Sequence, residues 1–594
     1  MPHATLPSPG FQALILCGPG ASFTTFTSTP QDIPKALLPI ANRPMVWYPL
    51  EWCYRMGVTG PTYVSTNTVQ RLNNFVDITI ITPPESLSSI EAAMSQNPHL
   101  TSLPAPKPDI VAPKDLTHAS GTGELFRLPE VQDVIREDFI VLPCDIVCEL
   151  DGTSLMDAWM IEQAGFGAAT GGRNELGNVS MGIGGEKQGR RGGLGVWYQT
   201  KGEGSIKGEE TDFIATTKLP PPVVPPPADS LRCNISNLVY TAPTDTLNDI
   251  TEENKCLPIR HSLIQQHARV RMLTTYRDAH IYVFPYWVLE MIKQNHKFES
   301  ISEDVLGWWA KAGWQDGLGD KLGLREIYHP TQNSNGDLEG SQLLEEEIDI
   351  AQYSSTSRSR PDTSVTSTAL ASRVQNSNIP QAVQSLTSKP KLVVPPMLAY
   401  VQPSDPDAPL IRRVDTAHLL LSVSLRLAKL PSVEETGKDA ASPFAHHAKI
   451  AHKESIPKRC RVEAENSLLA ENVIVEEKCN IKESVVGANC KIGEGVRLLR
   501  CLLMEGVEVG SYAQLTDCIL GRRCKIEGGS PKEDDRTILT KCEVQDGQVV
   551  EWGTEAKNEK IMRFDMGSDE GDDEGGFGDV EDFADDQEEG ISLR

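Results

Sequence analysis

The chain has 594 residues, several times the length of an ordinary domain, so we expect two or three domains. Its 23% charged and 39% apolar residues are typical of a globular protein, and no run approaches the ~18 consecutive apolar residues of a membrane helix. With 56 basic and 82 acidic residues, a broad basic surface is excluded, so we expect neither a membrane nor a nucleic acid as a direct partner.

Residues 11–330 alternate strand-like apolar runs with helical patterns. The apolar runs lie at 13–17, 63–64, 139–143 and 280–284, and the helical patterns lie between them at 45–56 and 154–162. This alternation indicates an α/β domain with a Rossmann-like mixed sheet of mainly parallel strands.

Residues 331–388 are rich in Ser, Thr, Asn and Gln and poor in aromatic residues. We interpret them as a disordered insertion and not as a domain boundary, because apolar content resumes at 391–430 and needs the core of the first domain. The α/β domain is therefore expected to span 11–430, and a polar linker is expected at 431–455.

A repeat begins after the linker. Apolar residues recur every six residues within a triplet, and the triplets begin 17 residues apart, at Leu469, Val486, Leu503 and Leu520. A second, smaller apolar residue follows four residues later at almost every step. The pattern is typical of hexapeptide repeats, so we expect a left-handed parallel β-helix over 456–555 whose inward positions include Cys479, Cys490 and Cys524. No His follows residue 452, which argues against an acyltransferase of this fold, because those enzymes place a catalytic His between coils.

The cysteine and histidine spacing predicts no metal site. None of the 13 cysteines forms a C-x2-C pair, and Cys144 and Cys148 have a poor zinc spacing. His446, His447 and His452 lie in an Ala-rich connecting stretch. We expect neither a metal nor another cofactor. The odd number of cysteines, together with a start at 1–10 that lacks the features of a signal peptide, indicates reduced thiols in the cytoplasm.

Residues 556–594 are expected to form an acidic disordered tail. The stretch 565–590 has 13 acidic residues and no basic one, which is half of the net charge of −26. A solvated, solubilising tail and a tail that docks on a basic partner both fit this composition.

Five residues are candidates for a nucleotide pocket. Gly18 and Gly20 follow the first strand, and Lys35 lies in a Pro-Lys-Ala-Leu-Leu-Pro segment. Glycines in this position let the backbone approach a phosphate, and a Lys supplies charge. Gly121 belongs to a Gly-Thr-Gly segment, and Asp145 ends a strand. Each has a structural alternative: the glycines as turn formers, Lys35 as a surface lysine and Asp145 as a strand-end cap.

Together with the β-helix, these motifs resemble the sugar-nucleotide pyrophosphorylase family, whose members join a sugar phosphate to a nucleoside triphosphate and release pyrophosphate. The resemblance implies a nucleotidyltransferase-like domain with a Gly-rich loop and Lys35 at the nucleotide. It also implies that Gly121 lies on the nucleobase side and that Asp145 takes the position of the metal-binding aspartate.

The sequence departs from the active members of that family. Ser22 stands where they carry an arginine, and the spacing from residue 27 to 34 is about three residues longer. The segment 298–306 offers no clear match for the second metal carboxylate. Transfer of this type depends on positioned cations and a metal, so we expect no catalytic residue and only a vestigial nucleotide pocket.

A degenerate domain of this kind followed by a β-helix resembles the gamma and epsilon subunits of eukaryotic translation initiation factor 2B. The segments at 42–52, 144–147, 300–305 and 501–504 resemble the gamma type. Only 46 residues follow Gln548 (594 − 548), too few for the helical exchange domain of the epsilon type. The resemblance implies a non-catalytic subunit that pairs with epsilon, on a core of alpha, beta and delta subunits, and promotes GDP release from translation initiation factor 2, a GTPase.

Two other functions stay open. One is an active GDP-mannose-type pyrophosphorylase. The other is a regulatory paralogue that binds a sugar nucleotide without turnover. The missing loop arginine at Ser22 argues against the active enzyme.

Overall fold

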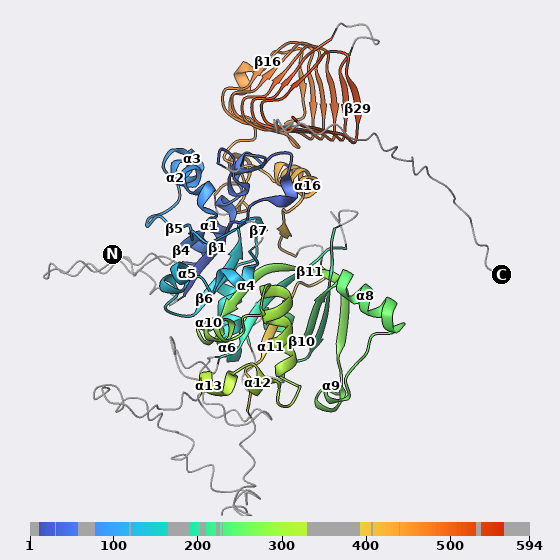
Figure 1. Cartoon of the computed structure of the whole chain (residues 1–594). Coiled ribbons are helices and arrows are strands. Elements are labelled where there is room, and N and C mark those ends of the chain that lie inside the picture. The colour runs from blue at the N-terminus through green and yellow to red at the C-terminus, as the bar shows by residue number, and fades with distance from the viewer. Residues whose placement is uncertain are drawn as a thin grey trace, which may run out of the picture.

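The computed structural model describes residues 11–29, 31–57, 78–117, 120–163, 191–201, 209–220, 226–227, 230–328, 392–405, 408–438, 440–529 and 536–563 (Figure 1). The strand expected at 63–64, the insertion expected at 331–388 and the acidic stretch 565–590 lie outside these residues.

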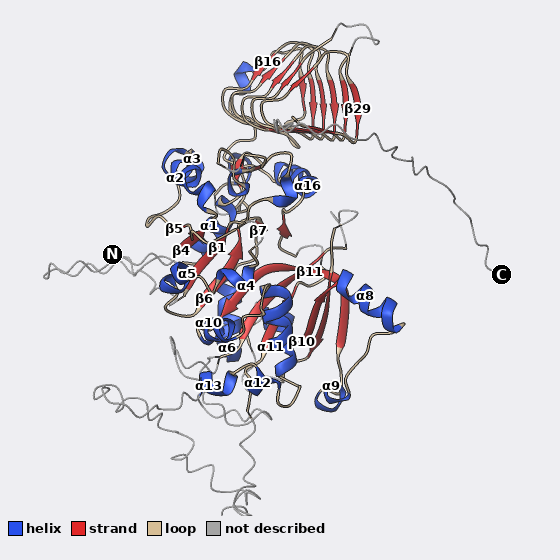
Figure 2. Ribbon diagram, in the orientation of Figure 1, coloured by secondary structure: helices blue, strands red, loops and turns tan. Residues whose placement is uncertain are grey.

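A mixed sheet of nine strands forms the centre of the α/β part (Figure 2). In spatial order its strands are β5 (Asp109–Val111), β4 (Ile78–Ile81), β1 (Gln12–Leu16), β6 (Phe139–Pro143), β11 (Arg271–Phe284), β8 (Gly193–Gln199), β12 (Met397–Val401), β10 (Ile235–Pro243) and β9 (Asp212–Thr217).

The expectation of mainly parallel strands holds for only part of this sheet. Pairing is parallel from β5 through β4 and β1 to β6, and again between β8 and β12. β11 runs antiparallel to β6, β8 and β9, and β10 runs antiparallel to β9 and β12. The expectation was wrong for the pairs that β10 and β11 make. Strand direction depends on the connections between strands, and the apolar pattern of a single strand does not encode it.

Helices and shorter strands complete the α/β part. The helices are α1 (Trp47–Arg55), α2 (Leu87–Gln96), α3 (Pro98–Thr101), α4 (Thr122–Leu125), α5 (Pro129–Val134), α6 (Gly152–Gln163), α8 (Thr244–Asn254), α9 (His261–Gln266), α10 (Trp287–Gln294), α11 (Leu306–Ala312), α12 (Leu318–Lys321), α13 (Leu324–Tyr328), α16 (Ala417–Lys429) and α17 (Val433–Thr436). Two small antiparallel pairs join β2 (Pro39–Ile40) to β3 (Arg43–Pro44) and β7 (Ile146–Cys148) to β13 (Ile411–Arg413). Among the described helices, none combines the length and the apolar character that a bilayer crossing requires.

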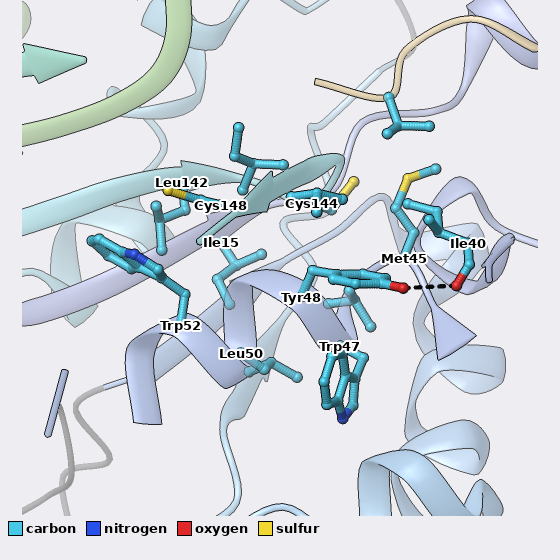
Figure 3. Close-up of a cluster of buried hydrophobic side chains, with 14 of the residues drawn as sticks. Ile15, Ile40, Met45, Trp47, Tyr48, Leu50, Trp52, Leu142, Cys144 and Cys148 are labelled. Atoms are coloured by element: carbon cyan, nitrogen blue, oxygen red, sulfur yellow. Dashed lines mark hydrogen bonds between the residues drawn. The ribbon is translucent and has the colours of Figure 1, made fainter. Parts of the chain in front are cut away.

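The sheet separates two hydrophobic cores. On β1, Ala13 and Ile15 point into one core while Leu14 points into the other, as the two-residue period of a strand requires. The first core also holds Trp52 of α1 and Leu420 of α16. Figure 3 shows part of this core, including the hydrogen bond from the Tyr48 hydroxyl group to the Ile40 carbonyl oxygen at 2.8 Å. Because both faces of the nine-stranded sheet are apolar, helices must cover both of them.

The expected local elements are largely confirmed. β1 lies one residue earlier than expected, and β6 coincides with the expected strand at 139–143. α1 and α6 occupy the two expected helical segments. The strand expected at 280–284 is only the end of β11, whose exposed first half lacks the apolar run that we used to find strands.

The hexapeptide β-helix is confirmed, as three parallel sheets. The first contains β14 (Arg461–Val462), β17 (Asn480–Lys482), β20 (Arg497–Leu499), β23 (Gln514–Thr516), β26 (Ile538–Thr540) and β29 (Glu555–Lys557). The second contains β15 (Leu468–Leu469), β18 (Val485–Val486), β21 (Leu502–Leu503), β24 (Ile519–Leu520), β27 (Glu543–Val544) and β30 (Lys560–Ile561). The third contains β16 (Ile474–Val475), β19 (Lys491–Ile492), β22 (Glu508–Val509), β25 (Lys525–Ile526) and β28 (Val549–Val550). Cys479, Cys490 and Cys524 are buried inside, as expected.

The β-helix continues past the residue at which we expected the acidic tail to begin. β29 and β30 pair with β26 and β27, and Ala556 is buried beneath Leu539 in the next coil. The expected boundary at 556 was therefore too early. The insertion before β26 shifts the phase of the repeat, and the 17-residue spacing resumes only afterwards, between positions 539 and 556.

One outward face of the β-helix packs on the α/β part. Leu468, Val485, Leu502 and Ile519 share the first core with α16. The stretch 431–455, expected to be a polar linker, contributes to the same junction. Its Phe444 is buried, and the Arg43 guanidinium group donates to the carbonyl oxygens of Phe444 and Ala445 at 3.0 and 2.9 Å. The two parts are therefore joined by a continuous apolar core.

Candidate functional site

The structure brings Gly18, Gly20, Lys35 and Asp145 to one edge of the sheet. β1 and β6 are parallel neighbours with Leu16 opposite Pro143, so the loop after β1 and the residues after β6 leave the sheet together. Lys35 reaches this edge from the 3-10 turn Lys35–Leu37, and its Nζ lies 2.7 Å from Asp145 Oδ2. Gly121 is the N-cap residue of α4, and the atoms nearest to a Cβ there belong to Glu299, not to Lys35 or Asp145.

The glycine loop folds onto itself. Gly20 has a φ of 83°, a conformation that favours glycine, and a Cβ there would lie 3.0 Å from Thr27 Cγ2. The Thr27 hydroxyl group donates to the carbonyl oxygens of Gly20 and Phe23, both at 2.9 Å. Phe23 is buried, and its ring centroid lies 5.8 Å from Lys35 Nζ. Ser22, at the position of the missing arginine, is exposed. The side chains of Phe23 and Thr27 therefore occupy the space beside the glycine loop.

Asp145 is held ionised by two cations. Burial alone would raise the pKa of its carboxyl group, but Lys35 and Arg413 outweigh burial and hold the pKa well below its usual value. Arg413 Nη2 lies 3.5 Å from Asp145 Oδ2. Burial lowers the pKa of Lys35, but Asp145 more than compensates and leaves it raised. Lys35 and Arg413 thus serve one buried carboxylate.

The charged cluster continues away from Asp145 along β11. Arg413 also contacts Asp415 at 3.7 Å and His280 Nε2 at 3.2 Å. Asp415 in turn accepts from Arg277 Nη2 at 2.6 Å. Burial and then Arg413 hold the pKa of His280 well below its usual value, so this ring is neutral near pH 7. Sequence reasoning missed Arg277, His280 and Arg413, because no motif or spacing in the chain connects them to Asp145.

The residues present do not fit a magnesium ion at Asp145. Asp145 Oδ1 is buried without a hydrogen-bond partner, which leaves one oxygen available in principle. However, the carboxylate already faces Lys35 and Arg413, whose charges would repel a divalent cation. Among the described residues, no cluster of three or more His, Cys, Asp or Glu side chains could hold a metal.

The Gly-Thr-Gly segment at Gly121 packs against a backbone segment at 298–301. The Gly123 amide donates to the Glu299 carbonyl oxygen at 2.7 Å, and the Ile301 amide donates to Thr122 Oγ1 at 3.0 Å. A Cβ on Gly121 would overlap the same Glu299 oxygen. Arg127, next to this motif, donates to the Phe298 carbonyl oxygen at 2.7 Å. Close backbone packing is thus a sufficient reason for these glycines.

The arrangement is suited to holding the fold together more than to binding an anion. Lys35 and Arg413 are both engaged with Asp145. Two surface depressions in the described ranges lie at the start of the β-helix. The larger one is lined by Pro457, Glu476, Glu477 and Glu494, whose negative charges would repel a nucleotide.

Comparison with known proteins gives the following similarities. Residues 463–563 match the family described as the GMPPB C-terminal domain. The chain is also 24% identical over 307 residues to translation initiation factor eIF2B subunit gamma of Schizosaccharomyces pombe (strain 972 / ATCC 24843), a match that covers 51% of this chain. It spans 52%, about half, of that relative's length. The first match lies within the β-helix, and the second is to a protein whose name places it in translation initiation.

Proposed function

We propose that the chain is a non-catalytic, gamma-type subunit of a translation initiation factor 2B complex. In this role it pairs with the epsilon subunit, and the pair sits on the alpha, beta and delta subunits in the cytoplasm. The complex promotes exchange of GDP for GTP on translation initiation factor 2. The α/β part is then a degenerate nucleotidyltransferase-like domain, and the β-helix is left-handed as in hexapeptide-repeat proteins.

The 24% identity to the eIF2B subunit gamma of Schizosaccharomyces pombe supports the translation-factor part of this proposal, and the 2.7 Å ion pair between Lys35 and Asp145 carries its non-catalytic part. In an active pyrophosphorylase the corresponding groups must serve a triphosphate and a metal, each of opposite charge to the group that binds it. Here the lysine and the aspartate neutralise each other, and Arg413 reinforces the pair at 3.5 Å. Catalysis by this pocket would require the pair to break first.

Two assays test the proposal. The purified chain, supplied with Mg²⁺, GTP and mannose 1-phosphate, should release no pyrophosphate. The chain alone should also leave GDP on translation initiation factor 2, whereas adding it to the epsilon subunit should accelerate GDP release, because a docking subunit contributes binding energy and orientation to its catalytic partner. Exchange by this chain alone, or no gain over epsilon alone, would contradict the proposal.

The second candidate is a GDP-mannose-type pyrophosphorylase, which the match of residues 463–563 to the GMPPB C-terminal domain favours. Turnover with Mg²⁺ at an ordinary enzyme rate of ~1–1000 per second would establish it. A useful companion variant is Ser22→Arg, which restores the guanidinium group at the loop. We expect this variant to stay inactive, because Lys35 and Asp145 would still be paired. Binding of GDP-mannose without turnover would identify the regulatory paralogue instead.

A further inference from the structure

Two cysteines lie side by side on the first two coils of the β-helix. β14 pairs in register with β17, with Arg461 opposite Asn480, so the preceding residues Cys460 and Cys479 are also neighbours. The Arg461 amide donates to the Cys479 carbonyl oxygen at 2.8 Å, which fixes the backbones at this point. Adjacent strands lie about 4.8 Å apart, within the Cα separation of about 4.4–6.8 Å that a disulfide requires.

The two sulfur atoms also converge on one acceptor. Cys460 Sγ donates to the Glu476 carbonyl oxygen at 2.8 Å, and Cys479 Sγ lies 3.1 Å from the same oxygen. Burial is the main cause of the raised pKa of Cys479, and the neighbouring Cys460 raises this pKa further. Both cysteines are free thiols. The pair therefore already has the proximity that a cross-link needs.

One member of the pair is accessible to small molecules. Cys460 is half-buried while Cys479 is buried, at 1% exposure. The depression lined by Pro457, Glu476 and Glu477 lies beside them, because the Cys460 amide donates to the Pro457 carbonyl oxygen at 3.0 Å and both sulfurs contact Glu476. A small neutral oxidant can thus reach the half-buried Cys460 beside this depression, whose negative charges disfavour anions.

We propose that Cys460 and Cys479 form a reversible disulfide when the chain meets hydrogen peroxide. The Cys460 thiolate attacks one peroxide oxygen, so an S–O bond forms, the O–O bond breaks and hydroxide leaves. The Cys479 sulfur then attacks the Cys460 sulfur, the S–S bond forms, and the S–O bond breaks with loss of a second hydroxide. The two thiol protons complete two water molecules, so two thiols and one peroxide give one disulfide and two waters.

The disulfide would fasten the first coil of the β-helix to the second. β14 is an edge strand with only β17 as a partner in its sheet, so strand pairing supports it on one side only. A cross-link at Cys460 restrains the chain at the point where it enters β14. Oxidation therefore stabilises the end of the β-helix that follows the 431–455 segment.

The same β-helix contains a matched control pair. Cys501 and Cys518 precede the in-register residues Leu502 and Ile519, and so occupy the same kind of neighbouring position one coil apart. Unlike Cys460, both are completely buried, at 0% exposure. If strand geometry alone decided reactivity, both pairs would oxidise equally. Because accessibility also matters, we predict that only the first pair, Cys460 and Cys479, reacts.

The experiment treats the full folded chain with hydrogen peroxide, blocks remaining thiols and digests it with trypsin without reduction. Cleavage at the flanking basic residues should release the dipeptide 460–461 linked to the peptide 479–482, two hydrogens lighter than the separate thiols, and dithiothreitol should separate them. The Cys460→Ser variant should lose the linked product while Cys479 stays reduced. The Cys501→Ser variant should keep it.

Three results would overturn the proposal. The first is oxidation of the exposed Cys233 and Cys256 with no linked 460–479 product. The second is cross-linking of Cys501 to Cys518 at an equal rate, since accessibility would then be irrelevant. The third is formation of the 460–479 link only after urea unfolds the chain. Hydrogen exchange at the Arg461 amide supplies an independent readout, and it should slow on oxidation and recover on reduction.

Discussion

Lys35 and Asp145 are 110 positions apart in the sequence, yet their side chains meet at 2.7 Å at the end of two neighbouring parallel strands. The pair is nearly inaccessible, with side-chain exposures of 12% and 2%. Removing one partner would leave buried charge uncompensated, which costs far more than loss of a surface ion pair. The first prediction follows from this difference in cost between breaking a buried ion pair and breaking an exposed one.

Asp145→Asn should destabilise the chain by about 3–5 kcal/mol, because Lys35 and Arg413 would be left buried without their carboxylate. The measurement is the free energy of unfolding from urea titration. Glu290→Gln is the matched control, since it breaks a pair of similar length, 2.8 Å to Lys293, that is far more exposed. This control should cost less than about 1 kcal/mol. Equal losses for the two variants would contradict a structural role for the buried pair.

The second prediction concerns Asp278 and pH. Burial, followed by repulsion from Asp212, raises the pKa of Asp278 to about 7. The unfolded carboxyl group titrates near pH ~3.9, so between these values the folded chain binds the extra proton. Stability therefore falls as pH rises from about 4 to about 7 and levels off above 7.

Asp278→Asn should remove this fall, because an amide stays neutral while it can still accept from the Tyr282 hydroxyl group, which lies 2.6 Å from Asp278 Oδ2. Thermal unfolding across this pH range is the measurement, with each variant compared with the parent at every pH. Asp145 contributes with the opposite sign, because its folded pKa is depressed. Its stabilisation is complete above the unfolded pKa of ~3.9 and is lost as pH falls below that value. An unchanged slope in Asp278→Asn would show that another group titrates.

The third prediction concerns the β-helix. Ile492→Asp should place a charge between stacked coils, at a cost of several kcal/mol, because Ile492 points inward at 1% exposure. We expect the variant to lose co-purification with the epsilon subunit. Lys491→Gln is the control at the adjacent outward position, where the lysine side chain is 62% exposed. A stable Ile492→Asp variant that still co-purifies would place pairing entirely on the α/β part.

The sequence was sufficient to predict features that repeat or that lie close together along the chain. The 17-residue period located the β-helix and its inward cysteines, because every coil imposes the same requirement on every strand. The pairing of Lys35 with Asp145 was not predictable in this way. Both residues were chosen as candidates, but only the parallel register of β1 and β6 brings them together. Arg413 comes from a segment beyond residues 331–388 and carries no local signal.

The same limit applies to the segment at 431–455, whose packing the sequence did not reveal. Its composition is polar, but Phe444 and Ile450 are buried, the first under Arg43 and the second beside Leu469. Phe444 and Ile450 alone give no periodicity, so composition could not show that the segment is packed. The residues that anchor it, Arg43 and Leu469, lie in different structural units.

The last prediction separates two glycines that the sequence treats alike. Gly18→Ala should be nearly neutral, because a Cβ at Gly18 would meet no atom within 4 Å. Gly121→Ala should be strongly destabilising, because its Cβ would overlap the Glu299 carbonyl oxygen, a backbone atom that cannot rotate away. Urea unfolding of both variants measures the difference in their free energies of unfolding, which we expect to be about 1–3 kcal/mol.

Binding of GTP or GDP-mannose to the Gly18→Ala variant tests the alternative function of the loop, since a phosphate held by the loop backbone needs the close approach that glycine allows. A stable Gly121→Ala protein would contradict the role of Gly121 in packing against residues 298–301. A Gly18→Ala protein that has lost nucleotide affinity would show that the glycine loop is part of a nucleotide pocket.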